Sequence, residues 1–173
     1  MAVVRDYTSQ NFNGGSDDDI IISQAVHSGF GERLNTFNGG GGDNRLDGRA
    51  GRDIINGEDG NDTLLGGDGD DRVSGGKGTD TLTGGDGADR FVLALDIEAG
   101  TDTVTDFSVA SGDILVVNTA DGDETTLAVL CVSVADSGNH ANLIFGGAVV
   151  MTLNDIDHTL ISDANFGDYF EVI

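Results

Sequence analysis

The stretch Gly66-Gly67-Asp68-Gly69-Asp70-Asp71-Arg72-Val73-Ser74 decides the fold, because it recurs along the chain. Residues 75–83 and then residues 84–92 repeat its pattern with no spacer between them. Each unit reads G-G-x-G-x-D-x-U-x, where U is a bulky apolar residue. A short fixed period of this kind indicates one small structural unit stacked on itself.

The period continues upstream of these units, where it becomes less regular. Residues 57–65 and 48–56 keep the phase with fewer glycines, and the two units before them carry Asn44 and Asn35 at the sixth position. A unit-like stretch at residues 14–22 is out of phase, because residues 23–29 number seven rather than nine. We therefore expect a loop or irregular coil there. The apolar residues of the period are Phe37, Leu46, Ile55, Leu64, Val73, Leu82 and Phe91.

The unit predicts a turn followed by a short strand. Glycines at its first, second and fourth positions admit positive φ, so we expect the first six positions to form a turn and the last three a strand. Two units per coil stack strands about 4.8 Å apart and point each U residue inward. The prediction is a flattened right-handed coil of two parallel sheets, with Phe37 and Phe91 covering the ends of its thin core.

Sixth-position carboxylates would gather on the two edges of such a coil. Asp53, Asp71 and Asp89 fall on one edge, and Asp62 and Asp80 on the other. Carboxylates that repeat every ~5 Å repel one another unless a cation lies between them. Oxygen ligands in a flexible arrangement suit Ca²⁺ better than Mg²⁺. With one cysteine and three scattered histidines, the chain lacks suitable ligands for softer metals.

The tandem units over residues 48–92 resemble the RTX (repeats-in-toxin, haemolysin-type) calcium-binding nonapeptide. The resemblance implies an all-β protein, a parallel β-roll, with several Ca²⁺ ions between adjacent turns on each edge. It assigns the sixth-position side chain as a ligand, with main-chain carbonyls of the turn completing each site. The side-chain ligands that it implies are Asp53, Asp62, Asp71, Asp80 and Asp89, with Asn44 as a weaker ligand. The turn residues of these sites are Gly48, Gly51, Gly57, Asp59, Gly60, Gly66, Gly67, Asp68, Gly69, Gly75, Gly76, Lys77, Gly78, Gly84, Gly85, Asp86 and Gly87.

After Phe91 the period ends and ordinary strand patterns begin. These patterns lie at residues 103–107, 113–117, 126–134, 143–145 and 149–153, with a short turn or helix expected at 162–166. We expect about five strands, mostly antiparallel, to form a C-terminal β-strand cap on the open end of the roll. The expected organisation is an irregular region at 1–38, the roll at 39–92 and the cap at 93–173.

Two C-terminal segments carry a second resemblance. Residues 87–107 are similar to the segment after the last repeat in type I-secreted proteases and alginate epimerase modules. The chain ends in an acid followed by apolar residues, at 168–173, which resembles the uncleaved secretion signal of such proteins. An ordinary final strand would give the same pattern.

Composition points to an acidic chain that folds with its ion. There are 31 Asp and Glu against 8 Lys and Arg, and the net charge is −23. We expect such a chain to repel nucleic acid and anionic membranes and to stay unfolded without the ion. Residues 1–13 lack the apolar core of a signal peptide, and no stretch is long and apolar enough for membrane insertion. The lone Cys131 is expected to behave as a small core hydrophobe.

The leading hypothesis is a non-enzymatic, secreted calcium-binding module, exported without a cleaved signal peptide by type I secretion machinery and folded by Ca²⁺ outside the cell. No H-E-x-x-H motif, nucleophile elbow or phosphate loop is present. The alternative is a calcium-stabilised module that binds an alginate-like polysaccharide or a surface, with Arg72 and Arg90 as ligand-binding residues on one face. Outward arginines that only solubilise the chain explain the same pattern. The chain would also suit the tail of a larger enzyme or adhesin.

Overall fold

Two β-sheets form the described part of the chain. The computed structural model describes residues 2–4, 11–22, 34–94, 100–108, 110–118, 133–136, 140–145, 148–154 and 170–172. Sheet A has nine strands in the order β1-β3-β5-β7-β9-β11-β15-β14-β13, and sheet B has seven in the order β16-β12-β10-β8-β6-β4-β2. The described residues include no helix that is long and apolar enough to cross a membrane.

The strands of the two sheets have the following bounds. Sheet A contains β1 Ala2–Val4, β3 Asp19–Ile22, β5 Arg45–Ala50, β7 Thr63–Asp68, β9 Thr81–Asp86, β11 Asp102–Val104, β13 Ser133–Asp136, β14 His140–Phe145 and β15 Ala148–Asn154. Sheet B contains β2 Asn11–Gly15, β4 Thr36–Gly41, β6 Ile54–Asp59, β8 Arg72–Lys77, β10 Arg90–Ala94, β12 Ile114–Asn118 and β16 Phe170–Val172.

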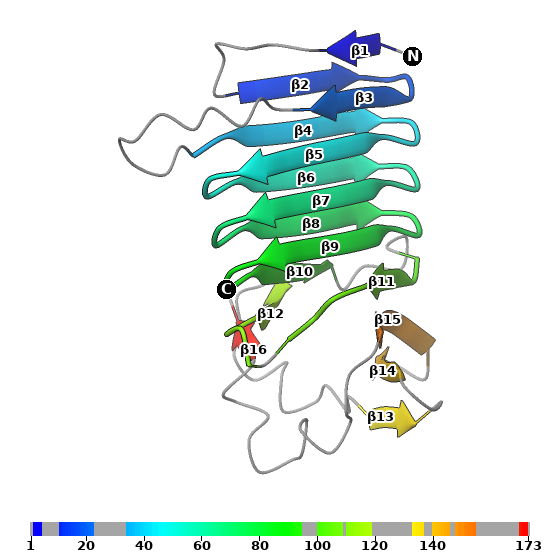
Figure 1. The fold of residues 1–173 in the computed structure, drawn as a ribbon. Coiled ribbons are helices and arrows are strands. Elements are labelled where there is room, and N and C mark those ends of the chain that lie inside the picture. The colour runs from blue at the N-terminus through cyan, green and yellow to red at the C-terminus, as the bar shows by residue number, and fades with distance from the viewer. Residues whose placement is uncertain are drawn as a thin grey trace.

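The chain passes from one sheet to the other at each turn, and so forms a coil (Figure 1). Across the repeats each strand pairs in parallel with the strand 18 residues further on, as Leu46 does with Leu64 and Leu64 with Leu82. The same spacing joins Ile55 to Val73 in sheet B. The prediction of two nine-residue units per coil, a parallel β-roll, is therefore confirmed.

The strands of the repeats are longer than the sequence predicted. Most have six residues, and β8 runs through Gly75 and Gly76, where we expected a turn. The ladder between β6 and β8 pairs Asn56 with Ser74 and then Glu58 with Gly76, and omits the glycine between them. Gly76 has a φ of 106°. The glycines therefore bend the strand without ending it, because the neighbouring coil still supplies pairing partners.

The N-terminal strands join the same coil with a longer spacing. Phe12 pairs with Phe37, and Ile21 with Leu46, so the spacing is 25 residues instead of 18. The seven additional residues agree with the interruption expected at residues 23–29. That segment itself lies outside the described residues.

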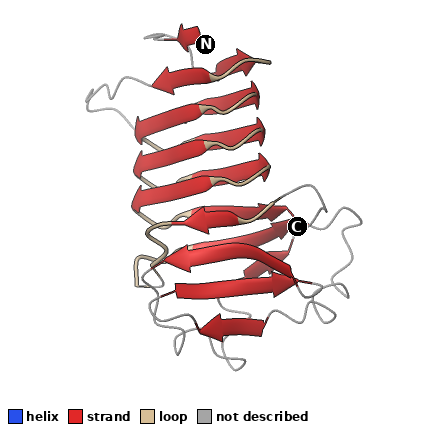
Figure 2. Cartoon of the chain, turned by 90° about the vertical axis from the view of Figure 1, so that its right-hand side faces the viewer, coloured by secondary structure: helices blue, strands red, loops and turns tan. Residues whose placement is uncertain are grey.

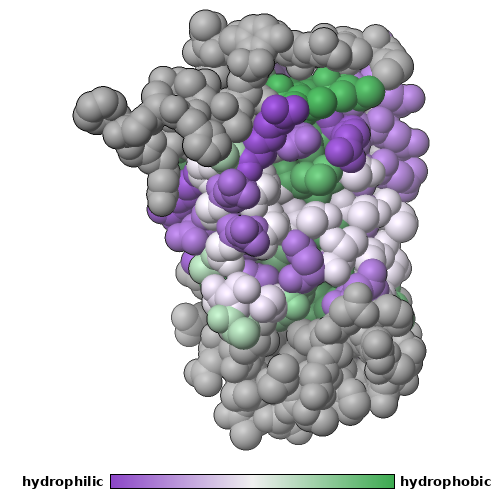
Figure 3. Space-filling model, in the orientation of Figure 1, coloured by the Kyte–Doolittle hydropathy of each residue, from purple (hydrophilic) through white to green (hydrophobic). Residues whose placement is uncertain are grey.

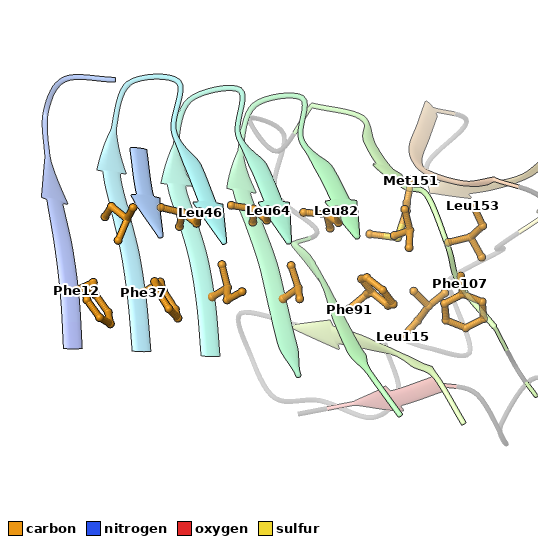
Figure 4. Packing of buried hydrophobic residues seen from close by; sticks show 14 residues of the cluster. Phe12, Phe37, Leu46, Leu64, Leu82, Phe91, Phe107, Leu115, Met151 and Leu153 are labelled. Atoms are coloured by element: carbon orange, nitrogen blue, oxygen red, sulfur yellow. The ribbon is translucent and has the colours of Figure 1, made fainter. Parts of the chain in front are cut away.

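The core consists of two facing files of buried side chains, one from each sheet (Figure 4). Sheet A contributes Ile21, Leu46, Leu64, Leu82 and Val104, and sheet B contributes Phe12, Phe37, Ile55, Val73, Phe91 and Leu115. The expectation that Phe37 and Phe91 close the ends is wrong. Phe12 stacks on Phe37 at 4.8 Å with an interplanar angle of 8°, and Phe107 lies 6.0 Å from Phe91. Both rings lie inside the core because the coil continues past them.

The described strands after Phe91 are mostly parallel, which corrects the expected antiparallel cap. β11 pairs with β9, β12 with β10, β15 with β11 and β16 with β12, all in parallel. Only β13, β14 and β15 pair as antiparallel neighbours. Figure 2 shows these strands continuing the stack below the repeats. The reason is local: Asp102-Thr103-Val104 keeps the D-x-U order that seats a strand on the coil below.

The three-region organisation of the chain stays a prediction. β4 and β10 run across the two expected boundaries, at residues 38 and 92, so the sheets themselves do not divide there. Residues 126–132 and 162–166 lie outside the described part, as does Cys131. On the face seen in Figure 3, hydrophilic residues gather toward the edge where the turns follow one another.

Two non-glycine residues occupy the second position of their units with positive φ. Arg49 has a φ of 71° and Glu58 a φ of 76°, where the other units have glycine. A left-handed conformation costs an L-residue about 1–2 kcal/mol, and a new glycine returns roughly 0.4–1 kcal/mol of that through the entropy of the unfolded chain.

We therefore expect Glu58→Gly to raise the free energy of unfolding by up to ~1 kcal/mol, because the strain outweighs the added chain entropy. Thermal unfolding at saturating calcium would measure it. Glu58→Gln is the control, since it removes the charge and keeps the Cβ. Equal stabilisation by both variants would show that charge, not backbone strain, sets the effect.

Candidate metal centre

Each edge of the roll carries a continuous ladder of sixth-position side chains. In each step the main-chain N–H of one residue donates to Oδ1 of the equivalent residue in the next coil. Asp53 N–H donates to Asp71 (2.7 Å) and Asp71 N–H to Asp89 (2.9 Å) on one edge. Asp62 N–H donates to Asp80 (2.7 Å) on the other. The complete ladders are Asn35, Asp53, Asp71, Asp89, Asp113 and Asp19, Asn44, Asp62, Asp80, Asp102.

The second carboxylate oxygen of each repeat aspartate has no hydrogen-bond partner. These buried atoms are Oδ2 of Asp53, Asp62, Asp71, Asp80 and Asp89. Buried polar atoms are nearly always paired, because an unpaired one costs about 1–3 kcal/mol. Five orphaned oxygens in the same position of successive turns are suited to ligate cations.

The turns bring main-chain carbonyl oxygens close to these edges. Gly69 has a φ of 124°, and a Cβ on it would overlap the carbonyl oxygen of Gly51 in the coil below. A Cβ on Gly66 would collide with Asp71 Oδ2 and would lie 2.5 Å from the carbonyl oxygen of Gly84. Glycine is therefore required at these positions, and the turns add neutral oxygens beside the carboxylates. Together they form the hard, all-oxygen donor set that Ca²⁺ prefers.

The absence of larger side-chain clusters agrees with such a mixed donor set. Within the described ranges, no three His, Cys, Asp or Glu side chains come together as a conventional metal cluster. Any ion at these edges must therefore take part of its coordination from the main chain.

Burial makes the free carboxylates poor anions. Desolvation raises the pKa of Asp53 and Asp89 to about 6 and that of Asp71 to about 7, from an ordinary value of 3.8. For Asp71, the charges of Asp53 and Asp89 raise the pKa further, while the hydrogen bond from the Asp53 main chain opposes the shift. A cation between the coils would offset both the desolvation and the repulsion.

The structure brings the expected side-chain positions together on the two edges. Asp53, Asp71 and Asp89 share one edge, and Asn44 shares the other with Asp62 and Asp80. Of the expected turn residues, those at the third position point their side chains to solvent. They are Asp59, Asp68, Lys77 and Asp86. Lys77 and Asp59 form an exposed ion pair at 3.6 Å, so only their main chains remain available at the edges.

Three ladder residues were missed from the sequence: Asp19, Asp102 and Asp113. Each is buried and lies two residues before a buried apolar residue. The triplets Asp19-Ile20-Ile21, Asp102-Thr103-Val104 and Asp113-Ile114-Leu115 carry the D-x-U signal without the complete glycine turn. That triplet could have identified them.

Arg72 and Arg90 lie side by side on sheet B, paired in register between β8 and β10. With Arg52 they line a hollow of about 490 Å³, whose other lining residues are Leu34, Asp53, Ile54, Asp70 and Asp71. Burial, with the adjacent charge of Arg90, lowers the pKa of Arg72. Two like charges in neighbouring strands give this face a local positive field within an acidic chain.

The comparisons with known proteins agree with the repeat geometry. Residues 31–64 and 65–96 match the family model of the RTX calcium-binding nonapeptide repeat. The chain is thus an RTX-repeat protein in this region, and the ion that its repeats bind is Ca²⁺. A search of curated proteins gave no significant match.

Two solved structures are similar to the chain. The extracellular lipase LipA from Serratia marcescens aligns at a TM-score of 0.49 and 16% identity, over 95% of this chain and 39% of the lipase. This chain therefore spans well under half of the lipase's length. The AlgE6R3 subunit of the Azotobacter vinelandii mannuronan C5-epimerase aligns at 0.29 and 24%, over 96% of this chain and 81% of that subunit.

The raised carboxylate pKa values predict how the calcium-free roll responds to pH. Because the folded chain binds protons more tightly than the unfolded chain, its free energy of unfolding falls as pH rises from about 4 to about 7. Acidifying the calcium-free chain from pH 7.5 to pH 5 should therefore increase its β signal in circular dichroism. At saturating calcium, the same change should weaken ion binding, because the ligands must be deprotonated.

Screening with 0.5 M NaCl at pH 7.5 is the control for surface repulsion, on the order of several Debye lengths shorter than low-salt buffer. A β signal that salt restores as fully as acid would contradict a role for the buried carboxylates.

Proposed function

We propose that this chain is a secreted, non-catalytic module that remains unfolded until Ca²⁺ binds outside the cell. The proposed side-chain ligands are the sixth-position carboxylates Asp53, Asp62, Asp71, Asp80 and Asp89, with Asn44 as a weaker ligand. Carbonyls of the glycine turns complete the sites. The observation that carries the proposal is the row of five buried Oδ2 atoms without hydrogen-bond partners.

A calcium-dependent fold follows from the charge and the thin core. The chain has a net charge of −23, and each coil buries one large apolar side chain per sheet. Unneutralised carboxylates stacked on both edges oppose the coil that the hydrophobic files favour. The binding free energy of the ions is then part of the folding free energy. Low calcium in the cytosol would keep the chain extended for export, and millimolar calcium outside would fold it.

Export by a type I system is the second part of the proposal. It accounts for a chain that waits for extracellular calcium, and it assigns the acidic and apolar residues 168–173 to an uncleaved C-terminal signal. Fusing residues 119–173 to an unrelated slow-folding passenger in a strain with and without type I machinery tests it. Export of the fusion only with the machinery supports the signal, and retention in both strains argues against it.

Calcium titration of the whole chain, followed by circular dichroism, tests the folding switch. The β signal should be absent in excess chelator and should appear cooperatively with calcium. Asp71→Asn should raise the calcium midpoint roughly tenfold, because affinity follows the ligand charge. Asp70→Asn is a matched control, since Asp70 is exposed and its Oδ1 accepts only the N–H of Ala88. β structure already complete in chelator, or equal effects of the two substitutions, would overturn the proposal.

The arginine-lined hollow favours a second candidate role, the binding of an acidic polysaccharide. Arg52 and Arg72 have no ion pair with an acid among the described residues, although the chain carries 31 acids. A volume of about 490 Å³ is within the range of small-ligand sites, and guanidinium groups suit sugar carboxylates. A uronate oligomer is the simplest such ligand.

Calorimetry with an oligouronate tests this role, with both solutions dialysed into one calcium buffer. Arg72→Gln should weaken binding by about tenfold, as expected for the loss of one charge-assisted hydrogen bond. Arg45→Gln is the control, because Arg45 has the same repeat position but lies on sheet A. No heat at millimolar oligomer, or equal losses from both substitutions, would exclude the role.

A further inference from the structure

A partial copy of the repeat follows the last complete one. Residues 100–104 read Gly-Thr-Asp-Thr-Val, and residues 78–82 read Gly-Thr-Asp-Thr-Leu. The copy lies beyond residues 31–96, where the nonapeptide family matches, and it has no glycine pair before it. Thr103 nevertheless pairs with Thr81 and Val104 with Leu82 in the parallel ladder of sheet A. The coil thus gains one more turn from a different kind of sequence.

The turn of this copy stacks on the roll as the repeats do. A Cβ on Gly78 would overlap the carbonyl oxygen of Gly60, and a Cβ on Gly100 would overlap that of Gly78 in the same way. The main-chain N–H of Asp80 donates to Asp102 Oδ1 at 3.1 Å. Both the glycine contact and the carboxylate ladder therefore continue to Asp102 without a break.

The carboxyl groups of Asp80 and Asp102 lie within hydrogen-bonding reach of each other. Both residues are buried, with 1% and 2% of their surface exposed, and Asp80 Oδ2 has no hydrogen-bond partner. Two ionised carboxylates cannot stay together in such a place unless a cation joins them. The orphaned oxygen is the independent sign that a ligand belongs between these two coils.

The opposite edge ends differently. Asp113 Oδ1 accepts the N–H of Asp89 at 3.0 Å, but its Oδ2 accepts the N–H of Ser108 at 2.8 Å. A Cβ on Gly112 would meet only the Ala88 side chain, at 3.2 Å, so this turn does not stack on a carbonyl oxygen. Both oxygens of Asp113 are used by main-chain donors, as in a cap.

We propose that Asp80 and Asp102 hold an additional Ca²⁺ ion between the last repeat on their edge and the segment after it, and that the other edge ends at Asp113 with no such ion. The inference rests on the proposed role of the sixth-position carboxylates. It extends that role to one residue outside the repeats and withholds it from another.

Native mass spectrometry of the whole chain in calcium tests the asymmetry by counting ions. Asp102→Asn should bind one ion fewer than the wild type, and Asp113→Asn should keep the wild-type number. An unchanged count in Asp102→Asn, or an ion lost from both variants, would overturn the inference. A wild-type chain that binds no calcium would instead refute the proposed function itself.

If Asp102→Asn does not fold, wild-type crystals soaked in terbium decide the question by anomalous scattering. The expected result is a peak between Asp80 and Asp102 and none beside Asp113. Peaks along the repeats with no peak at Asp102 would refute the additional site.

Discussion

The structure depends on the two different uses of one carboxylate. In every repeat, Oδ1 of the sixth residue accepts a main-chain N–H from the preceding coil, while Oδ2 stays buried without a partner. The first contact sets the spacing and register of successive coils. The second leaves a negative oxygen in a place where desolvation is costly, so the coil needs a cation at the position that its own hydrogen bonds create. Glycine at the first and fourth positions follows from the same geometry, since any Cβ there would collide with Oδ2 or with a carbonyl oxygen.

The core explains why the cation has to contribute so much. Each coil adds one large side chain to each sheet, as Leu64 and Val73 do, and these side chains contact mainly the coils above and below. A stack of this kind gains stability only from its nearest neighbours. Its hydrophobic gain per residue is small, and the net charge of −23 works against compaction. Ions along both edges act where this architecture is weakest, at the turns, which hold no large apolar side chain.

The sequence predicted the features that follow from period and charge. A spacing of nine fixed the 18-residue coil, the two edges and the inward row from Phe37 to Phe91, and the phase break predicted the extra seven residues before β4. Strand length was missed because glycine preferences describe single residues, whereas pairing with a neighbouring coil keeps Gly75 and Gly76 in the strand. The turns at Asp102 and Asp113 were missed because they keep the D-x-U triplet but not the glycine turn. Side-chain spacing alone also cannot show which carboxylate oxygen is already paired.

That last distinction determines how the roll ends. Asp102 and Asp113 occupy equivalent places on successive strands, and both accept the N–H of a repeat aspartate. Only Asp113 has its second oxygen filled by a main-chain donor, because the turn from Ser108 to Asp113 folds back onto it. A short turn can therefore replace an ion as the partner of a ladder carboxylate. Where the chain supplies that turn, the edge closes with neutral donors; where it supplies Gly100 stacked on Gly78, the edge keeps the geometry of the repeats. The segment after the repeats is thus part of the roll, and its local turn geometry decides where the need for cations stops.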